Sequence, residues 1–205
     1  MVKTNHIPYF SILIACITLI YSLYVAYDIN GSLFGKVRIL QLESYGGVTL
    51  GHLKNFEIWR LFTSQIIHVK QLHMLFNVLS IVVLGIFLER YIGFFRMLIL
   101  WFISGSAGTV FSTLFASPPW NLGTGASQAI MGFSALGVVL IHQKIDISKG
   151  LKLSLIFAIL PALLLDLIFA HYPKPGHLFG FIVGYLISLY YLKKIKIIHQ
   201  NANSS

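Results

Sequence analysis

Six apolar stretches constrain this chain more than any other feature, because each is close to the length of a helix that crosses a bilayer. A hydrocarbon core about 30 Å thick needs around 20 residues of α-helix. The stretches cover residues 8–27, 72–88, 94–115, 127–142, 151–170 and 177–192. Only 10% of the 205 residues are charged, against about 25% in soluble domains. The sequence therefore predicts an all-α integral membrane protein, with six transmembrane helices in one domain that covers residues 1–205.

The segments between the helices predict further features. The first connection, residues 28–71, is long and contains "FEIWRLFTSQIIH". Its Trp59 favours the membrane–water interface, so we expect this loop to lie on the membrane surface. The first apolar stretch has no small-residue cleavage site, which indicates a retained helix rather than a signal peptide. Residues 193–205 read as a basic polar tail, and the single cysteine, Cys16, excludes an intrachain disulfide.

The distribution of basic residues predicts that both termini are cytoplasmic. With six helices, the two termini, the second-to-third connection and the fourth-to-fifth connection share one side of the membrane. The short segments of that side carry nine Lys and Arg, whereas the short loops of the other side carry Lys174 alone. An excess of Lys and Arg marks the cytoplasmic side, and this topology explains the net charge of +9 better than nucleic-acid binding does. The nine are Lys3, Arg90, Arg96, Lys144, Lys149, Lys152, Lys193, Lys194 and Lys196.

Polar side chains at the outer ends of three predicted helices indicate a reaction centre. Ser127 begins the stretch 127–142, His177 begins the stretch 177–192, and His73 begins the second stretch. Asn77 follows His73 by four residues and therefore shares its helix face. Polar side chains inside membranes usually face the bundle interior, so we expect these four to meet at one depth.

A serine beside a histidine is the arrangement of a nucleophile and its general base. Free N–H groups at the helix start near Ser127 could stabilise an oxyanion, together with His73 and Asn77. We place Asp166 two to three turns into its helix, away from His177, and interpret it as structural. The expected catalytic group is therefore a Ser–His dyad. The other polar candidates, the histidines His52, His68, His142 and His171, are interpreted as interfacial residues.

Glycines surround both proposed catalytic residues. Gly123 and Gly125 allow a tight turn directly before Ser127 and bring the backbone close to a substrate. Gly180 and Gly184 follow His177 on one helix face. Small residues on such a face allow close helix packing, so we expect the helices at 127–142 and 177–192 to touch.

These motifs, taken in order, resemble those of the rhomboid intramembrane serine proteases. "WRLFTSQIIH" is similar to the family's Trp-Arg segment, "HMLFN" to its His-x-x-x-Asn pattern, and "LGIFLERYIG" and "GSAG" to the segments that follow. "GASQ" matches its Gly-x-Ser nucleophile, and "GHLFGFIVG" its last histidine with glycines. The resemblance implies that Ser127 attacks, that His177 is the base, and that His73 and Asn77 help to form the oxyanion site. It also implies transmembrane protein substrates within the lipid bilayer and no metal or other cofactor.

Two positions depart from the family pattern and bear on rate and specificity. Gln128 stands where the family usually has glycine after the nucleophile, and Met131 stands where it favours an aromatic residue that packs on the catalytic histidine. The alternative function is that of a catalytically weak or inactive rhomboid-like adaptor that binds membrane-protein clients. A small transporter would show inverted repeats, which the sequence lacks. The short six-helix form implies, by resemblance, a bacterial inner membrane.

Overall fold

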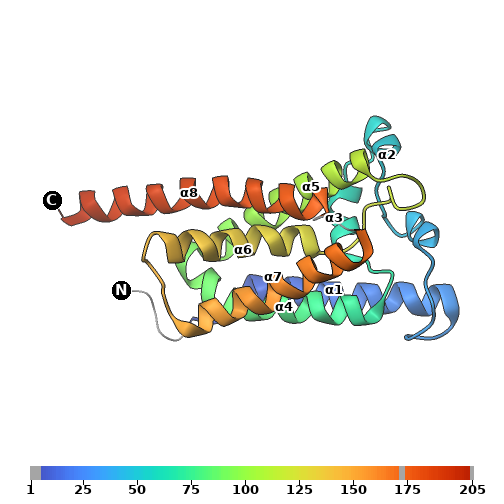
Figure 1. Cartoon of the computed structure of the whole chain (residues 1–205), viewed down its shortest axis with the longest axis horizontal. Coiled ribbons are helices and arrows are strands. Elements are labelled where there is room, and N and C mark those ends of the chain that lie inside the picture. Colours follow the sequence, from blue (N-terminus) through green and yellow to red (C-terminus); the bar gives the residue numbers. More distant parts are fainter. Residues whose placement is uncertain (1–5, 171–173, 204–205) are drawn as a thin grey trace.

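Six long helices make up most of the structure, a computed structural model that describes residues 6–170 and 174–203 (Figure 1). No strand occurs in these two ranges, so the all-α prediction is confirmed. Four short helical segments lie between the first two long helices. The long helices are α1 (Tyr9–Asn30), α4 (Gln71–Ile92), α5 (Phe94–Phe115), α6 (Ser127–His142), α7 (Lys149–Ala170) and α8 (Pro175–Asn203). The short segments are η1 (Ile39–Glu43), α2 (Leu50–Lys54), α3 (Arg60–Thr63) and η2 (Ser64–Ile66).

Five of the long helices are long and apolar enough to cross a membrane, and α6 is a shorter apolar helix. Large apolar side chains such as Ile20 on α1 and Ile168 on α7 are exposed, as expected of surfaces that face lipid. The protein is therefore an integral membrane protein. The helix at the C-terminus is longer than expected, because α8 continues through the basic residues to Asn203.

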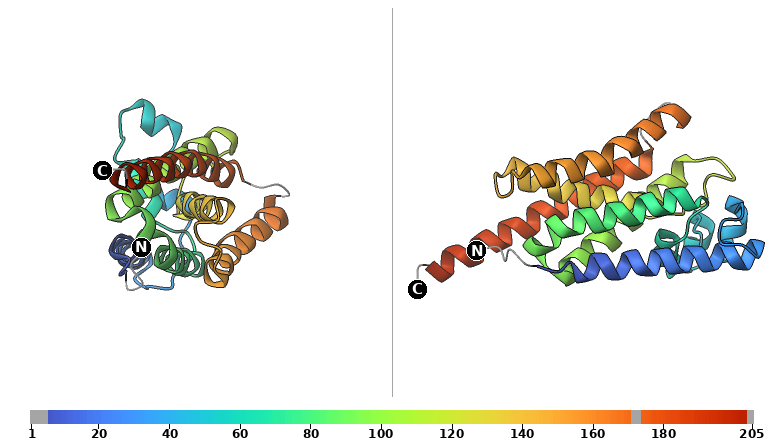
Figure 2. Two further views of the ribbon diagram at one scale, coloured as in Figure 1. Left: turned by 90° about the vertical axis from the view of Figure 1, so that its left-hand side faces the viewer. Right: turned by 90° about the horizontal axis from the view of Figure 1, so that it is seen from below.

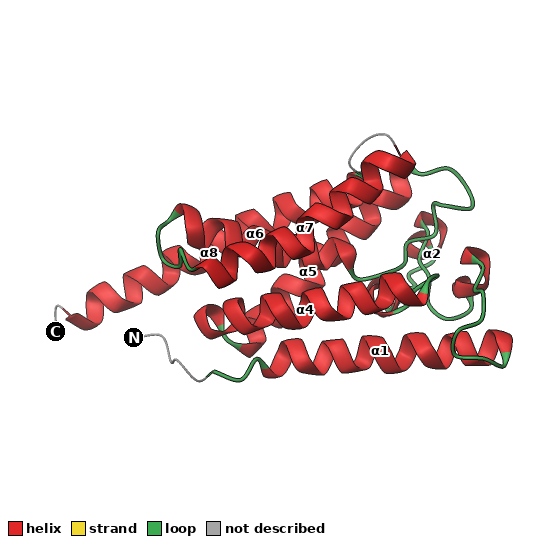
Figure 3. Ribbon diagram, turned by 60° about the horizontal axis from the view of Figure 1, so that its bottom comes forward, coloured by secondary structure: helices red, strands yellow, loops and turns green. Residues whose placement is uncertain are grey.

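The short helix α6 lies inside the bundle, in contact with α4, α5, α7 and α8 (Figure 2). Thirteen of its sixteen residues are buried, so it has no wide lipid-facing side. The helix α1 packs along α4 at the edge of the bundle (Figure 3). The connection between α1 and α4 lies at one end of the molecule, and the C-terminal end of α8 lies at the other (Figure 1). The helix α6 begins at the end that carries the α1–α4 connection.

Glycines bring the backbones of α6 and α8 into direct contact. A Cβ atom added to Gly184 would lie 2.4 Å from the Cα atom of Gly132. One added to Gly180 would lie 2.3 Å from the carbonyl oxygen of Gln128. Both distances are far below van der Waals contact, so no larger residue fits without moving a helix. Tight packing of this kind gives membrane helices much of their attraction for one another.

Two buried carboxylates connect helices at the end of the bundle where α4 ends. Glu89 on α4 accepts hydrogen bonds from the backbone N–H groups of Phe10 and Ser11, at 2.9 and 3.0 Å. A negative charge at the start of α1 also complements the helix dipole. Asp146, between α6 and α7, forms an ion pair with Arg90 at 2.6 Å. These contacts join α1, α4 and the α6–α7 connection without involving the opposite end.

The long connection between α1 and α4 is an ordered scaffold built around Arg60. Its guanidinium group pairs with Glu57 at 2.6 Å and donates to the carbonyl oxygen of Gly47 at 2.9 Å. It also lies 4.6 Å from the centroid of the Trp59 ring. A pair of backbone hydrogen bonds then links Val48 to Gly123, in the segment that leads into α6. The connection thereby supports the chain directly before Ser127.

Candidate active site

Ser127 and His177 lie within hydrogen-bond distance at the end of the bundle that carries the long connection. The Ser127 Oγ atom is 2.9 Å from the His177 Nε2 atom. Ser127 is the first residue of α6, and His177 lies in the first turn of α8. Both residues are buried, with exposed fractions of 7% and 8%. A hydroxyl at this distance from an imidazole can pass its proton to the ring nitrogen, which is the first requirement for a serine nucleophile.

The turn that presents Ser127 needs glycine at position 125. Gly125 has a φ angle of +87°, a left-handed conformation that residues with a Cβ atom rarely adopt. Its N–H donates to the carbonyl oxygen of Ser64 at 2.7 Å. Its missing side chain would face His68 and His73, at 3.6 and 3.9 Å. The turn therefore lies directly against these two imidazole rings.

Asp166 lies beside His177, so the interpretation that it is remote from the histidine is wrong. Its Oδ2 atom is 2.6 Å from the His177 Nδ1 atom and accepts the backbone N–H of Lys174 at 2.9 Å. Its Oδ1 atom is 3.3 Å from the Lys174 ammonium nitrogen. The carboxylate is 1% exposed. Asp166 lies one turn before the end of α7, and the chain returns to α8 within five residues, which brings positions 166 and 177 to the same level.

His73 and Asn77 are joined by His68, which is 5% exposed, so the interpretation of His68 as an interfacial residue is wrong. The Asn77 Nδ2 atom lies 2.9 Å from the His68 Nε2 atom and 3.4 Å from the His73 Nε2 atom. Asn77 is buried, whereas His73 is exposed. The available signal was the position of His68 directly after two isoleucines, Ile66 and Ile67, in a connection rich in apolar residues.

The hydrogen bonds of His68 determine its tautomer. The Ser22 hydroxyl donates to the carbonyl oxygen of Ile66 at 2.8 Å, so at 3.0 Å it accepts the N–H of His68 Nδ1. The His68 Nε2 atom is then unprotonated and accepts an N–H of Asn77. Burial, and next the neighbouring His73, hold the pKa of His68 well below its ordinary value, in agreement with a neutral ring. One amide proton of Asn77 is thus bound to His68, and the other faces the His73 Nε2 atom at 3.4 Å.

The two positions that depart from the rhomboid pattern are both buried. Gln128 is 8% exposed, and its side chain packs against Gly108 of α5 and Gly176 of α8. Its Oε1 atom lies 3.5 Å from the Ser127 Oγ atom. Met131, one turn further into α6, is 3% exposed. Gln128 is therefore a packing residue next to the nucleophile and does not lie at an open entrance.

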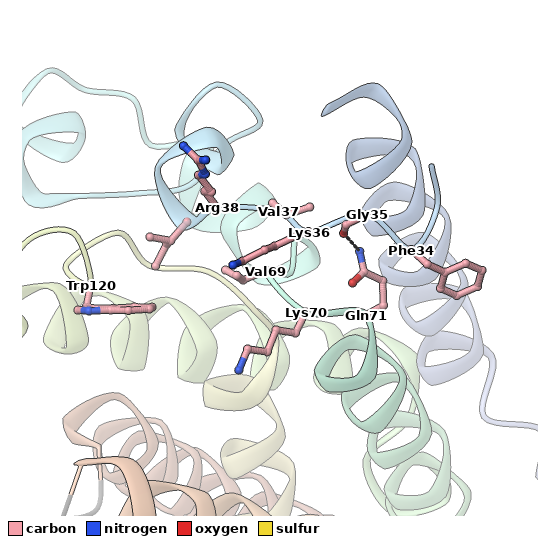
Figure 4. A pocket seen from close by; sticks show the side chains of 10 residues that line it. Phe34, Gly35, Lys36, Val37, Arg38, Val69, Lys70, Gln71 and Trp120 are labelled. Atoms are coloured by element: carbon pink, nitrogen blue, oxygen red, sulfur yellow. Dashed lines mark hydrogen bonds between the residues drawn. The ribbon is translucent and has the colours of Figure 1, made fainter. Parts of the chain in front are cut away.

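A basic cavity of about 460 Å³ lies beside the start of α4 (Figure 4). Lys36, Arg38 and Lys70 line it together with Trp120. Ser127 and His177 do not line it, and its cations lie at the surface, so we assign no chemistry to this cavity. In the described ranges, no three His, Cys, Asp or Glu side chains are grouped so that they could hold a metal ion. His171, expected at the interface, lies outside those ranges.

Curated relatives of this chain include proteins named as proteases and a protein named as inactive. "Rhomboid-like protease 3" of Toxoplasma gondii is 32% identical over 146 residues, which are 69% of this chain and 55% of that protein. YdcA of Bacillus subtilis is 28% identical over 194 residues, 94% of this chain and 96% of that protein. "Inactive RHOMBOID-like protein 8" of Arabidopsis thaliana is 31% identical over 119 residues, 58% of this chain and 34% of that protein. The chain thus spans about half or less of the length of several relatives.

A family model gives the membership directly. The model of the rhomboid domain matches residues 55–194. This range begins in the scaffold around Arg60 and includes Ser127, Asp166 and His177. It covers more than half of the chain and all the helices that surround the candidate site except α1. The chain belongs to the rhomboid family.

Proposed function

We propose that this protein is a serine endopeptidase that cleaves transmembrane segments of other membrane proteins within the bilayer. The observation that carries the proposal is the distance of 2.9 Å between the Ser127 Oγ and His177 Nε2 atoms. Family membership supports it, because the rhomboid relatives include proteins named as proteases. The Ser–His pair would be the reacting group.

The first chemical step is the formation of an acyl-enzyme. The His177 Nε2 atom takes the proton of Ser127 as the Oγ atom bonds to the carbonyl carbon of the scissile peptide. The carbonyl oxygen becomes an oxyanion. His177 then gives its proton to the leaving amide nitrogen, and the C–N bond breaks. In the second step a water molecule loses a proton to His177 and its oxygen bonds to the ester carbon. The bond from that carbon to Ser127 Oγ then breaks, His177 returns the proton to Oγ, and the new C-terminal carboxyl group of the product is released.

Three sources of donors lie close to Ser127, where the oxyanion would form. The first-turn N–H groups of α6 have no partner four residues earlier in the helix. Asn77 donates one amide proton to His68, and its second, in a longer 3.4 Å contact with the His73 Nε2 atom, would be the one available to an oxyanion. The ring of His73 lies against Gly125, two residues before Ser127. Donors fixed before the reaction stabilise developing charge without reorganising, and a single one contributes roughly 10²–10³ in rate in a soluble serine protease.

A serine-reactive fluorophosphonate tests the proposal on purified protein. The wild-type protein should become labelled and should cleave a fluorogenic peptide that contains a transmembrane helix. Ser127→Ala should lose both activities. Absence of labelling in folded wild-type protein would instead favour a rhomboid-like adaptor that binds clients without cutting them, the function class suggested by the relative named as inactive.

The proposed location is a bacterial inner membrane with both termini in the cytoplasm. Support comes from the nine Lys and Arg of the short segments on one side and from the positive-inside rule. In this orientation the start of α6, with Ser127, faces the outer side of the membrane. Substrates would be transmembrane proteins whose helices reach the site from the bilayer.

A further inference from the structure

A buried carboxylate touches the side of His177 that faces away from Ser127. The Asp166 Oδ2 atom lies 2.6 Å from the His177 Nδ1 atom, and the Ser127 Oγ atom lies 2.9 Å from the Nε2 atom of the same ring. The ring thus has a partner at each nitrogen. The two partners come from different helices, α7 and α6, while the ring itself belongs to α8.

We propose that Asp166 is a positioning residue for the reaction assigned above, so that the reacting group is a Ser127–His177–Asp166 triad. The inference rests on the proposed proteolytic function. An ionised carboxylate only accepts hydrogen bonds. The His177 Nδ1 atom must therefore carry the proton of the 2.6 Å bond. The Nε2 atom then keeps a free lone pair, which faces the Ser127 hydroxyl and can take its proton.

The carboxylate also stabilises the charged form of the ring during the reaction. When the Ser127 proton moves to Nε2, His177 becomes an imidazolium ion. Its positive charge lies next to the negative charge of Asp166, and Asp166 itself gains no proton. In soluble serine proteases the aspartate of the triad acts in this way, by holding the tautomer and orientation of the histidine and by stabilising the imidazolium.

The surroundings of Asp166 fix the carboxylate in the orientation that this role needs. The backbone N–H of Lys174 donates to Oδ2 at 2.9 Å, and the ammonium group of Lys174 lies 3.3 Å from Oδ1. Oδ2 therefore accepts a hydrogen bond from the start of α8, whereas Oδ1 has only the ion-pair contact with Lys174. The carboxylate is 1% exposed, so the bonds to Oδ2 are shielded from water, although the Lys174 side chain itself is half exposed. A purely structural aspartate would need the Lys174 contacts but not the contact with His177.

Asp166→Asn separates the two roles. The amide has the size of the carboxylate, and its oxygen can still accept the N–H of Lys174. Its NH₂ group can donate to the His177 Nδ1 atom, which would favour the tautomer with the proton on Nε2. We expect kcat for the transmembrane peptide to fall between about 10²-fold and 10⁴-fold, the upper value being that of a soluble triad. KM should change less than about twofold, because the substrate does not touch Asp166, and fluorophosphonate labelling should slow in parallel.

Two other variants serve as comparisons, in full-length protein reconstituted in liposomes. Asp146→Asn removes another buried carboxylate, which pairs with Arg90 at the opposite end of the bundle. It should leave kcat within about threefold of wild type, by the usual independence of distant sites. Lys174→Gln removes the ammonium group but keeps the backbone donor, and it should lose much less kcat than Asp166→Asn does. If Asp166→Asn lowers thermal stability while its folded fraction keeps the wild-type kcat, Asp166 is only structural and the inference is wrong.

A measurement on protein with native Asp166 tests the inference even if the Asp166→Asn variant does not fold. Histidine labelled with ¹⁵N reports which ring nitrogen carries the proton, and comparison with His177→Gln identifies the signals of this residue. The proton should reside on Nδ1. A ring protonated mainly on Nε2 in the resting state would overturn the inference. Failure of wild-type protein to label or cleave would instead refute the proposed function, and is thus distinguishable from failure of the Asp166 assignment alone.

Discussion

Gly180→Ala tests whether the backbone contact between α6 and α8 sets the geometry of the candidate site. A Cβ atom at position 180 would lie 2.3 Å from the carbonyl oxygen of Gln128, whereas ordinary contacts begin at 3.4 Å. The other two nearest atoms also belong to the backbone of Gln128, so no side-chain rotation relieves the clash. The helices must separate by about 1 Å, at a point adjacent to Ser127 and one turn from His177.

The size of this displacement gives the expected effect on activity. A misplacement of about 1 Å at a reacting pair costs roughly 10²-fold in rate. Forcing an extra carbon into a well-packed interior also lowers the free energy of unfolding by about 1–3 kcal/mol. Gly180→Ala should therefore lower kcat/KM for a transmembrane peptide by about 10²-fold and lower the thermal unfolding temperature in the same preparation.

Gly51→Ala is the matched control for this prediction. A Cβ atom there would meet Thr49 Oγ1 at 3.5 Å, an ordinary contact. Gly93 is unsuitable, because its φ angle of +78° would strain any other residue. Gly51→Ala should keep cleavage and unfolding temperature close to wild type. If Gly180→Ala also cleaves at near wild-type rate, the α6–α8 contact does not limit the reaction and the argument from helix spacing fails.

Four further predictions follow from the site and the topology. Ser127→Ala and His177→Ala should each abolish cleavage with unfolding temperatures near wild type, and substantial residual cleavage by either would contradict the assignment. Asn77→Ala should lower kcat more than it raises KM, by less than the roughly 10²–10³-fold of a lone oxyanion donor, and a purely raised KM would contradict this. The pKa of His68 is lowered by burial and by its neighbouring histidine, so the unfolded chain binds the proton more readily. Stability should then be full above about pH 6.5 and fall below it, by at most about 1.4 kcal/mol per pH unit. His68→Gln should flatten this pH dependence of the unfolding temperature, and an unchanged slope would refute the assignment. In intact cells an impermeant maleimide should label a cysteine at Ser32 but not one in the C-terminal tail, and the reverse pattern would invert the topology.

The pattern of apolar residues predicted helix bounds well where residues that disfavour a helix follow, such as the two prolines after α5. The predicted ranges 94–115 and 127–142 coincide with α5 and α6. The prediction for the last helix ended at residue 192, but α8 continues to Asn203. Hydropathy detects the part of a helix that lies in lipid, whereas Lys and Gln are good helix formers in water. A basic segment after a membrane span therefore does not reveal where the helix ends.

The parts of the site that the sequence did not predict depend on contacts between distant segments. Asp166 was placed two to three turns into its helix, but it lies about four turns after residue 151, and therefore one turn before the end of α7. A short α7–α8 connection brings residues on either side of it to one depth, so Asp166 meets His177. His68 is held by Ser22, 46 residues earlier in the chain. No local pattern encodes that pairing.

The length of α6 explains why a glycine-rich turn leads to the proposed nucleophile. Sixteen residues span roughly 24 Å of helix, about 6 Å less than a typical hydrocarbon core. If α6 ends at the same membrane surface as its longer neighbours, its first residue, Ser127, lies inside the hydrocarbon core, short of the other membrane surface. The chain before it must then descend into the bundle, and it is held there by the Val48–Gly123 pairing and by the bond from Gly125 to Ser64. For the proposed function, a serine at this depth would be within reach of a helix embedded in the bilayer.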